Sequence, residues 1–299
     1  MLAMRSPIVV ALLPLLTLVA NVPAAPMQQA SDQYARPQMV VDGTWLAAHV
    51  TDAGIRVVDM RPNGYAAAHV PGAVHLANSA IRDSTNPPAF VPSQAAFESL
   101  MGRLGISNAT RVVVYDERGG LYAARLWWML QYYGHPNVAL LDGGWTKWAA
   151  DGRPTSTEVP AVSATFTARP NPKWLATADD VLTAIKRGGT KIIDARTVGE
   201  IEGRDLRNIK RGGAIPSSIP VYWEDGLRPD RTFKSAAELR SLFQSRGLRP
   251  EDDVIAYCQV GMRASHDLFM LHLVGYDRLR HYYGAWEEWG NSETLPIKK

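Results

Sequence analysis

One residue in this chain combines a reactive side chain with a setting that can activate it. Cys258 is the only cysteine among the 299 residues. It follows the apolar run Val254–Tyr257, which predicts a strand, and it precedes Met262–Val274, where apolar residues recur at helical spacing. Loops between a strand's carboxyl end and a helix are where α/β folds place ligands, and their N–H groups and the helix dipole stabilise anions. We therefore expect the Cys258 thiolate to be stabilised and to act as a nucleophile.

The residues that follow the cysteine fit the same chemistry. Gly261 suits a loop position that needs an unusual backbone angle or a close approach, and Arg263 offers a permanent cation with a planar fork for an oxyanion. We predict that substrate is bound by the loop residues Gln259, Val260, Gly261, Met262 and Arg263. The alternative is a buried, unreactive cysteine, because free cysteines are among the most buried residues of proteins.

A cysteine loop that ends in arginine is also typical of phosphatases and arsenate reductases. Those enzymes have the spacing Cys-x5-Arg, whereas four residues separate Cys258 from Arg263. The shorter loop makes a tighter ring, which suits a sulfane sulfur better than a tetrahedral phosphate, and Tyr257 stands where those phosphatases carry a histidine. The spacing therefore argues against phosphate chemistry. His69 and His75 lack the spacing of helical metal ligands, so no metal site is expected. Covalent catalysis by a cysteine needs no organic cofactor, so none is expected either.

Two stretches of the chain repeat the same order of features. The triplet Asp59-Met60-Arg61 closes an apolar run, as Asp194-Ala195-Arg196 does 135 residues later. The motif Gly143-Gly144-Trp145 is matched by Gly284-Ala285-Trp286 at an offset of 141 residues. Repeats of this length indicate duplicated domains. Each copy alternates apolar strands with amphipathic helices, so we predict an α/β fold with two tandem domains, each a mainly parallel sheet with helices on both faces.

The second copy has the clearest element boundaries. Strands are predicted at residues 191–194, 254–257 and 280–283, and helices at residues 178–186, 236–245 and 262–274. Ser235 and Glu238 have the spacing of a capping box at the start of the helix 236–245. Residues 155–172 are rich in Thr, Ser and Pro and form the expected linker between the copies.

Three longer motifs point to a known family. They are His69-Val70-Pro71-Gly72-Ala73, Leu141-Asp142-Gly143-Gly144-Trp145 and Tyr283-Gly284-Ala285-Trp286-Glu287-Glu288-Trp289-Gly290. Together with the cysteine loop, they make the chain from about residue 37 to residue 297 resemble the tandem-domain rhodaneses, the thiosulfate/3-mercaptopyruvate sulfurtransferase family. The resemblance implies that Cys258 carries a persulfide. It also implies that a sulfane sulfur passes from thiosulfate or a related donor, through that persulfide, to a thiophilic acceptor such as cyanide or a thiol.

The resemblance also divides the work between the two copies. Asp116 stands in the first copy where Cys258 stands in the second, and a carboxylate cannot accept a sulfane sulfur. We therefore expect residues 37–154 to form an inactive rhodanese-like domain that shapes one wall of the active-site cleft. Residues 173–299 are then the catalytic rhodanese-like domain. A solvated loop acid at Asp116 is equally compatible with this division.

Two departures from the family pattern stand out. The second domain has Ala214-Ile215-Pro216-Ser217 where the family usually has His-Ile-Pro-Gly, so we expect altered local bonding and retained activity. The cysteine loop lacks the pattern Cys-Gly-Ser/Ala-Gly-Val-Thr of 3-mercaptopyruvate enzymes, which favours thiosulfate as the donor. Two alternatives stay open: an enzyme that prefers 3-mercaptopyruvate, and a periplasmic sulfur or redox carrier that acts on a dedicated protein partner.

The start of the chain has the features of a secretory signal peptide. Arg5 is followed by the apolar run 8–20 and by Val22-Pro23-Ala24, which is typical of a cleavage site. The run is shorter than the roughly 20 residues that a membrane span needs. We therefore expect residues 1–24 to be removed and the mature protein to be periplasmic, without membrane contact. The net charge of +3 does not indicate nucleic-acid binding, so the expected partners are small sulfur donors and acceptors and a thiol protein.

Overall fold

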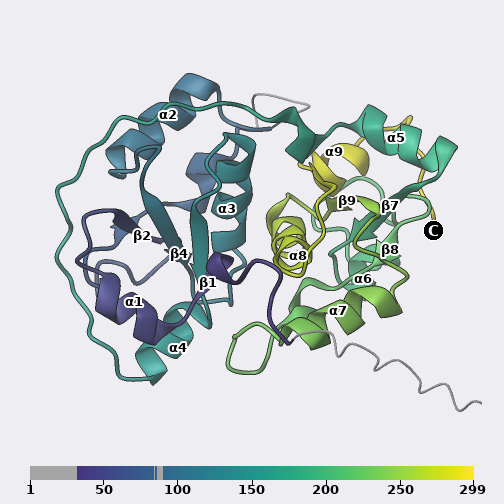
Figure 1. Ribbon diagram of the computed structural model, residues 1–299. Coiled ribbons are helices and arrows are strands. Elements are labelled where there is room, and N and C mark those ends of the chain that lie inside the picture. The colour runs from purple at the N-terminus through teal and green to yellow at the C-terminus, as the bar shows by residue number, and fades with distance from the viewer. Residues whose placement is uncertain (1–31, 84, 86–89) are drawn as a thin grey trace, which may run out of the picture. The chain divides into compact units, whose positions relative to one another are not determined.

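A computed structural model shows two parallel sheets of five strands each (Figure 1). It describes residues 32–83, 85 and 90–299, so the predicted signal peptide, residues 1–24, lies outside the described residues. The strand order is β1-β5-β4-β2-β3 in the first sheet and β6-β10-β9-β7-β8 in the second. The two orders are equivalent and all strand pairs within these sheets are parallel, which confirms the predicted α/β fold with two tandem domains.

Helices cover both faces of the first sheet. Its strands are β1 (Val40–Val41), β2 (Ile55–Asp59), β3 (Val74–His75), β4 (Arg111–Tyr115) and β5 (Val138–Leu141). Its helices are α1 (Gly43–His49), α2 (Gln94–Arg103), α3 (Ala123–Tyr132) and α4 (Gly144–Ala150), with 3-10 helices η1 (Pro37–Met39) and η2 (Asn78–Ile81). Val112 and Val114 of β4 share a core with Phe97 of α2, whereas Val113 shares the opposite core with Leu46 of α1.

The second sheet repeats this plan. Its strands are β6 (Leu175–Ala176), β7 (Thr190–Asp194), β8 (Ile219–Pro220), β9 (Asp253–Tyr257) and β10 (Leu279–Tyr282). Its helices are α5 (Ala178–Arg187), α6 (Val198–Ile201), α7 (Ala236–Ser245), α8 (Met262–Leu273) and α9 (Ala285–Trp289), with η3 (Pro172–Trp174) and η4 (Trp223–Gly226). The predicted boundaries hold to within one residue. The capping box is present as predicted, because Ser235 and Glu238 each accept the other's backbone N–H. Among the described residues, none of the helices has the length and apolarity needed to span a membrane.

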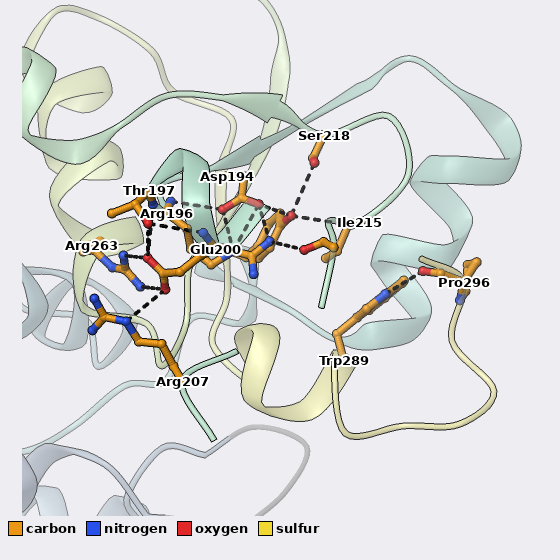
Figure 2. Close-up of polar contacts among 12 residues, drawn as sticks. Asp194, Arg196, Thr197, Glu200, Arg207, Ile215, Ser218, Arg263, Trp289 and Pro296 are labelled. Carbon is orange, nitrogen blue, oxygen red and sulfur yellow. Dashed lines mark hydrogen bonds and ion pairs between the residues drawn. The ribbon is translucent and has the colours of Figure 1, made fainter. Parts of the chain in front are cut away.

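A buried ion pair lies at the end of the central strands of each sheet. In the second domain the Arg196 side chain donates three hydrogen bonds to the Asp194 carboxylate (Figure 2). It donates one more to the carbonyl of Gly213. The hydroxyl of Tyr257, the last residue of β9, also donates to Asp194. The Arg196 guanidinium lies 4.2 Å from the Trp286 ring centroid, which explains why the Asp-x-Arg and Gly-x-Trp motifs recur together. This network fixes the end of β9, the strand that leads to Cys258.

The two domains meet along α3 and α8. Trp127 of α3 and Phe269 of α8 pack edge to face with ring centroids 5.2 Å apart, within one hydrophobic core. Arg125 of α3 donates to the hydroxyl of Tyr283 (2.6 Å), which donates to the carbonyl of Ile81 (3.0 Å). The start of α8, and the cysteine loop before it, are therefore held against the first domain.

The substitution at Ala214 has a visible counterpart in the first domain. His69 forms a two-way backbone bridge with Ser156, and its ring bonds the carbonyl oxygen of Glu158 (2.9 Å). Ala214 forms the equivalent backbone bridge with Lys298 but has no ring to add a further bond. The altered local bonding expected at Ala214 is therefore the loss of a side-chain tie, while the backbone pairing is kept.

Candidate active site

Cys258 lies directly after β9, at the carboxyl end of the strand. Its carbonyl oxygen accepts a hydrogen bond from the N–H of Trp286 (2.9 Å), which fixes the start of the loop. The side chain is only 1 % exposed, yet it lines a cavity of about 330 Å³. A cysteine that opens on a cavity can meet a small substrate, whereas a cysteine enclosed by the core could not.

The loop places backbone N–H groups beside the sulfur. The N–H of Gly261 donates to the Sγ of Cys258 (N···S 3.1 Å). Gly261 is the N-cap of α8, with φ +92°. The N–H groups in the first turn of a helix have no intrahelical partner, and at this helix start no side chain caps them. A Cβ at Gly261 would lie 2.8 Å from the ring of Tyr283, so the position needs glycine for space as well as for its backbone angle. This geometry can stabilise an anion bound above the sulfur.

The carbonyl side of the same loop is tied to α8 and β10. The carbonyl oxygen of Gly261 accepts hydrogen bonds from the Ser265 hydroxyl (2.9 Å) and from Nε2 of His281 (2.8 Å). Burial lowers the pKa of His281 to about 3, so its ring is neutral at physiological pH and Nε2 carries the proton. These bonds hold the loop in place without adding charge to the cavity.

Arg263, on the first turn of α8, pairs with a carboxylate of its own domain. Its two terminal nitrogens donate to the two carboxylate oxygens of Glu200, at 2.6 and 2.8 Å (Figure 2). Glu200 belongs to α6, where it forms a capping box with Thr197. Burial opposes the charge of Glu200, but the hydrogen bonds and charge of Arg263 outweigh it and lower the pKa of Glu200 to about 2. Donor binding by Arg263 stays a prediction, since its guanidinium, at the cavity wall, already holds a carboxylate.

The cavity wall draws on both domains. Beside Cys258, the predicted loop residues Gln259, Val260, Met262 and Arg263 line it. Three further sets of residues complete it: Arg118, Leu121 and Tyr122 of the first domain, Tyr222 and Trp223 at η4, and Thr197 and Arg207 around α6.

Three charged residues of this site were not predicted from the sequence: Arg118, Glu200 and Arg207. For Glu200 a signal was present, because the spacing Thr197-x-x-Glu200 is that of a capping box. For Arg118 and Arg207 the sequence carries no comparable signal, since only the packing of the two domains and the course of the chain after α6 bring them to the cavity.

Comparisons with known proteins agree with this geometry. The family model described as "Rhodanese-like domain" matches residues 42–151 and 177–292. The chain belongs to the rhodanese-like family. Each matched segment contains four of the five strands of one sheet, and the second segment contains Cys258.

Three relatives illustrate the range of this rhodanese-like family. The sulfur carrier protein TtuD of Thermus thermophilus is 36 % identical over 283 residues, covering 89 % of this chain and 98 % of that protein. A thiosulfate sulfurtransferase of Corynebacterium glutamicum is 35 % identical over 285 residues, covering 90 % and 93 %. The crystal structure of SseA from Escherichia coli, described as a 3-mercaptopyruvate sulfotransferase, matches with a TM-score of 0.75 and 30 % identity, covering 83 % and 98 %. Family membership alone therefore does not choose the donor.

The first rhodanese-like domain carries Asp116 directly after β4, the position that corresponds to the cysteine. One carboxylate oxygen accepts the N–H groups of Arg118 (2.7 Å) and Gly120 (2.9 Å). The other accepts those of Tyr122 (2.6 Å) and Ala123 (2.9 Å). Asp116 is fully buried, so the alternative of a solvated loop acid is wrong. The carboxylate binds the N–H groups of its own loop and leaves that loop no room for a substrate anion.

Proposed function

We propose that this protein is a sulfurtransferase in which Cys258 carries a sulfane sulfur as a persulfide. The observation that carries the proposal is the position of the thiol: its Sγ accepts the N–H of Gly261 and opens on a cavity at an uncapped helix start. Membership in the rhodanese-like family supports the same chemistry.

The proposed reaction has two displacement steps. The Cys258 thiolate attacks the outer sulfur of thiosulfate, a new S–S bond forms, and the original S–S bond breaks with its electron pair leaving on sulfite. The persulfide anion then lies beside the loop N–H groups, which stabilise its charge. Cyanide or a thiolate next attacks the outer sulfur, and the electron pair of the persulfide bond returns to Cys258 as thiolate. Each step is a simple displacement and needs no cofactor.

We propose thiosulfate as the preferred donor, with 3-mercaptopyruvate as the alternative. The loop residues Gln259, Val260 and Met262 support this choice, because they replace the small residues of the 3-mercaptopyruvate loop pattern. The test is a comparison of kcat/KM for thiosulfate, 3-mercaptopyruvate and glutathione persulfide with the mature protein. Thiosulfate should give the highest value, and a clear 3-mercaptopyruvate preference under matched conditions would reverse the assignment.

A second candidate function is that of a sulfur carrier that meets a dedicated thiol protein. The identity of 36 % to a protein named as a sulfur carrier favours it. A carrier would load sulfur on Cys258 but turn over small donors slowly in the absence of its partner. Rapid steady-state turnover of thiosulfate and cyanide by the purified protein would therefore argue for the enzyme and against the carrier.

We further propose that residues 1–24 direct export and that the mature protein works in the periplasm. The support is the sequence alone: Arg5, the apolar run 8–20 and the small residues before Ala25. Full-length protein produced in a Gram-negative host should appear in the periplasmic fraction with Ala25 at its N-terminus. Uncleaved protein in the cytoplasmic fraction would contradict this proposal.

A further inference from the structure

We propose that Arg118, contributed by the inactive first domain, is the cation that recognises the anionic end of the sulfur donor. The inference rests on the proposed function, and it assigns the first domain a direct part in substrate selection. Arg118 lines the cavity on the wall that faces the Cys258 loop.

The backbone of Arg118 is fixed by the buried carboxylate of its own loop. Its N–H donates to Asp116 at 2.7 Å, and three further N–H groups of the loop and helix start converge on the same carboxylate. Asp116 thereby holds the loop rigid at the point where the Arg118 side chain leaves it. A cationic side chain on a rigid backbone segment loses less conformational entropy on binding an anion than one on a mobile loop does.

The side chain of Arg118 is oriented by the second domain and still has free donors. Its guanidinium lies 5.4 Å from the ring centroid of Trp223, a cation–π arrangement. Its acidic partner among the described residues is Glu224, at the long distance of 3.7 Å. Glu224 is shared with Arg231, at 3.4 Å, so the three groups together carry one excess positive charge. Because the Arg118 side chain is 47 % exposed, its remaining N–H groups can meet a ligand in the cavity.

The other two arginines of the cavity have closer acidic partners than Arg118 has. Arg263 is 13 % exposed and makes a two-pronged pair with Glu200. Arg207 pairs with Asp205 at 3.2 Å and approaches Glu200 at 3.7 Å. Arg118 is thus the cavity arginine with the weakest acidic neighbour, and its planar fork matches the oxygens of a sulfonate or carboxylate. The substrate class this predicts is a sulfane sulfur carried on a small oxyanion.

The test compares a charged and an uncharged probe of the same thiol. Iodoacetate and iodoacetamide both alkylate Cys258 and differ chiefly in the charge of the carboxylate. Arg118→Gln should slow alkylation by iodoacetate several-fold and leave alkylation by iodoacetamide unchanged. It should also raise KM for thiosulfate about tenfold with little change in kcat, because a charge-assisted hydrogen bond is lost. Arg118→Lys should recover part of both effects.

The matched control is Arg103→Gln, an exposed arginine of the same domain whose side chain bonds Ser99 away from the cavity. It should behave as wild type with both alkylating agents. An equal fall in both alkylation rates for Arg118→Gln, or no change in either alkylation or KM, would overturn the inference. If the wild type failed to load sulfur from thiosulfate, the proposed function would fall, while the iodoacetate to iodoacetamide ratio would still decide whether Arg118 binds anions.

Discussion

The two strand–loop–helix junctions of this protein use one scaffold in opposite ways. After β4, the carboxylate of Asp116 accepts four N–H groups of its own loop and helix start. After β9, the Sγ of Cys258 accepts the N–H of Gly261. A thiol has no second acceptor atom that could reach the other N–H groups at the start of α8, so these remain for an anion bound above the sulfur. The carboxylate thus occupies the anion-binding N–H groups of its own loop, whereas the cysteine loop keeps such groups available for a ligand.

The residues that surround the two loops also differ. The repeat aligns Tyr65 with Glu200 and Tyr122 with Arg263, so the buried ion pair of Arg263 with Glu200 belongs to the second copy alone. The supporting turn differs as well: Gly144 has φ +54° and a Cβ there would lie 2.1 Å from the carbonyl oxygen of Asp116. Ala285 occupies the equivalent place with φ +57°. The cysteine loop therefore accommodates a Cβ at this position, in a strained conformation, whereas the Asp116 loop would exclude one.

The largest effect is expected for the residue that distinguishes the two loops most. Cys258→Ser should reduce sulfur transfer to background while the far-ultraviolet circular dichroism stays that of wild type, because a hydroxyl replaces the thiol without a change of shape. Adding Asp116→Cys to this variant should not restore activity, since position 116 does not line the cavity. Turnover of more than a few per cent in either protein would break the comparison between the loops.

The next effect concerns the ion pair between Arg263 and Glu200 in the second domain. Arg263→Ala removes the two-pronged partner of the buried Glu200 carboxylate and leaves it with Thr197 and with Arg207 at 3.7 Å. The free energy of unfolding should fall by about 3 kcal/mol at neutral pH. The lowered pKa of Glu200, about 2 against 4.5, means that the pair stabilises the fold above pH 4.5 and loses this contribution as the pH falls through about 2. The loss in Arg263→Ala should therefore shrink in acid.

Urea unfolding at neutral and acidic pH measures this effect. The matched control is the double variant Glu200→Gln/Arg263→Met, which removes both charges and should be closer to wild type than Arg263→Ala is. If the single variant were as stable as wild type at neutral pH, the pair would not hold α6 to the start of α8.

A smaller loss is expected in the Asp116 loop. Asp116→Asn keeps one oxygen acceptor and replaces the other by an amide nitrogen that can only donate, so two of the four N–H groups lose their acceptor. The free energy of unfolding should fall by about 2 kcal/mol. Because the same loop carries Arg118, KM for thiosulfate should rise as well, and kcat should change less. Unchanged stability would show that the four N–H groups find other partners, and would weaken the comparison of a filled with an open loop.

How far the sequence could predict this arrangement depends on the range of the interactions. The strands and helices of the second domain, and the cysteine loop between β9 and α8, follow from apolar runs and helical spacing over a few residues. The partner of Arg263 does not, because Glu200 precedes it by 63 residues and reaches it only through the crossover after β7. Arg118 belongs to a different domain and faces the cysteine only because α3 and α8 pack together. Local patterns thus predicted the loop that carries Cys258, whereas the charges that surround it depend on tertiary packing.

The smallest effect concerns Asp267, a buried residue of α8. It is fully buried, and neither carboxylate oxygen has a hydrogen-bond partner among the described residues. Burial, followed by the charge of Cys258, raises the pKa of Asp267, so the folded protein holds this proton more tightly than the unfolded chain. The contribution of this proton to the free energy of unfolding is fully present below 3.8, the pKa of the unfolded chain. It is lost as the pH rises toward the higher pKa of the folded protein.

Asp267→Asn removes the titration and keeps the shape of the side chain. The unfolding free energy of the variant minus that of wild type should be larger in mildly alkaline than in mildly acidic solution, by on the order of 1 kcal/mol. Urea unfolding at both pH values checks this. A stability difference that stays the same at both would contradict a buried neutral Asp267.

The central claim is that Cys258, alone in the open loop, carries the sulfur. The most direct measurement is the mass of the mature protein after incubation with thiosulfate and removal of excess donor, followed by peptide mapping. One added sulfur atom is expected on the peptide that contains Cys258, and it should be lost on addition of cyanide with formation of an equal amount of thiocyanate. An unchanged mass, sulfur on another peptide, or a sulfonate attached to Cys258 would contradict it.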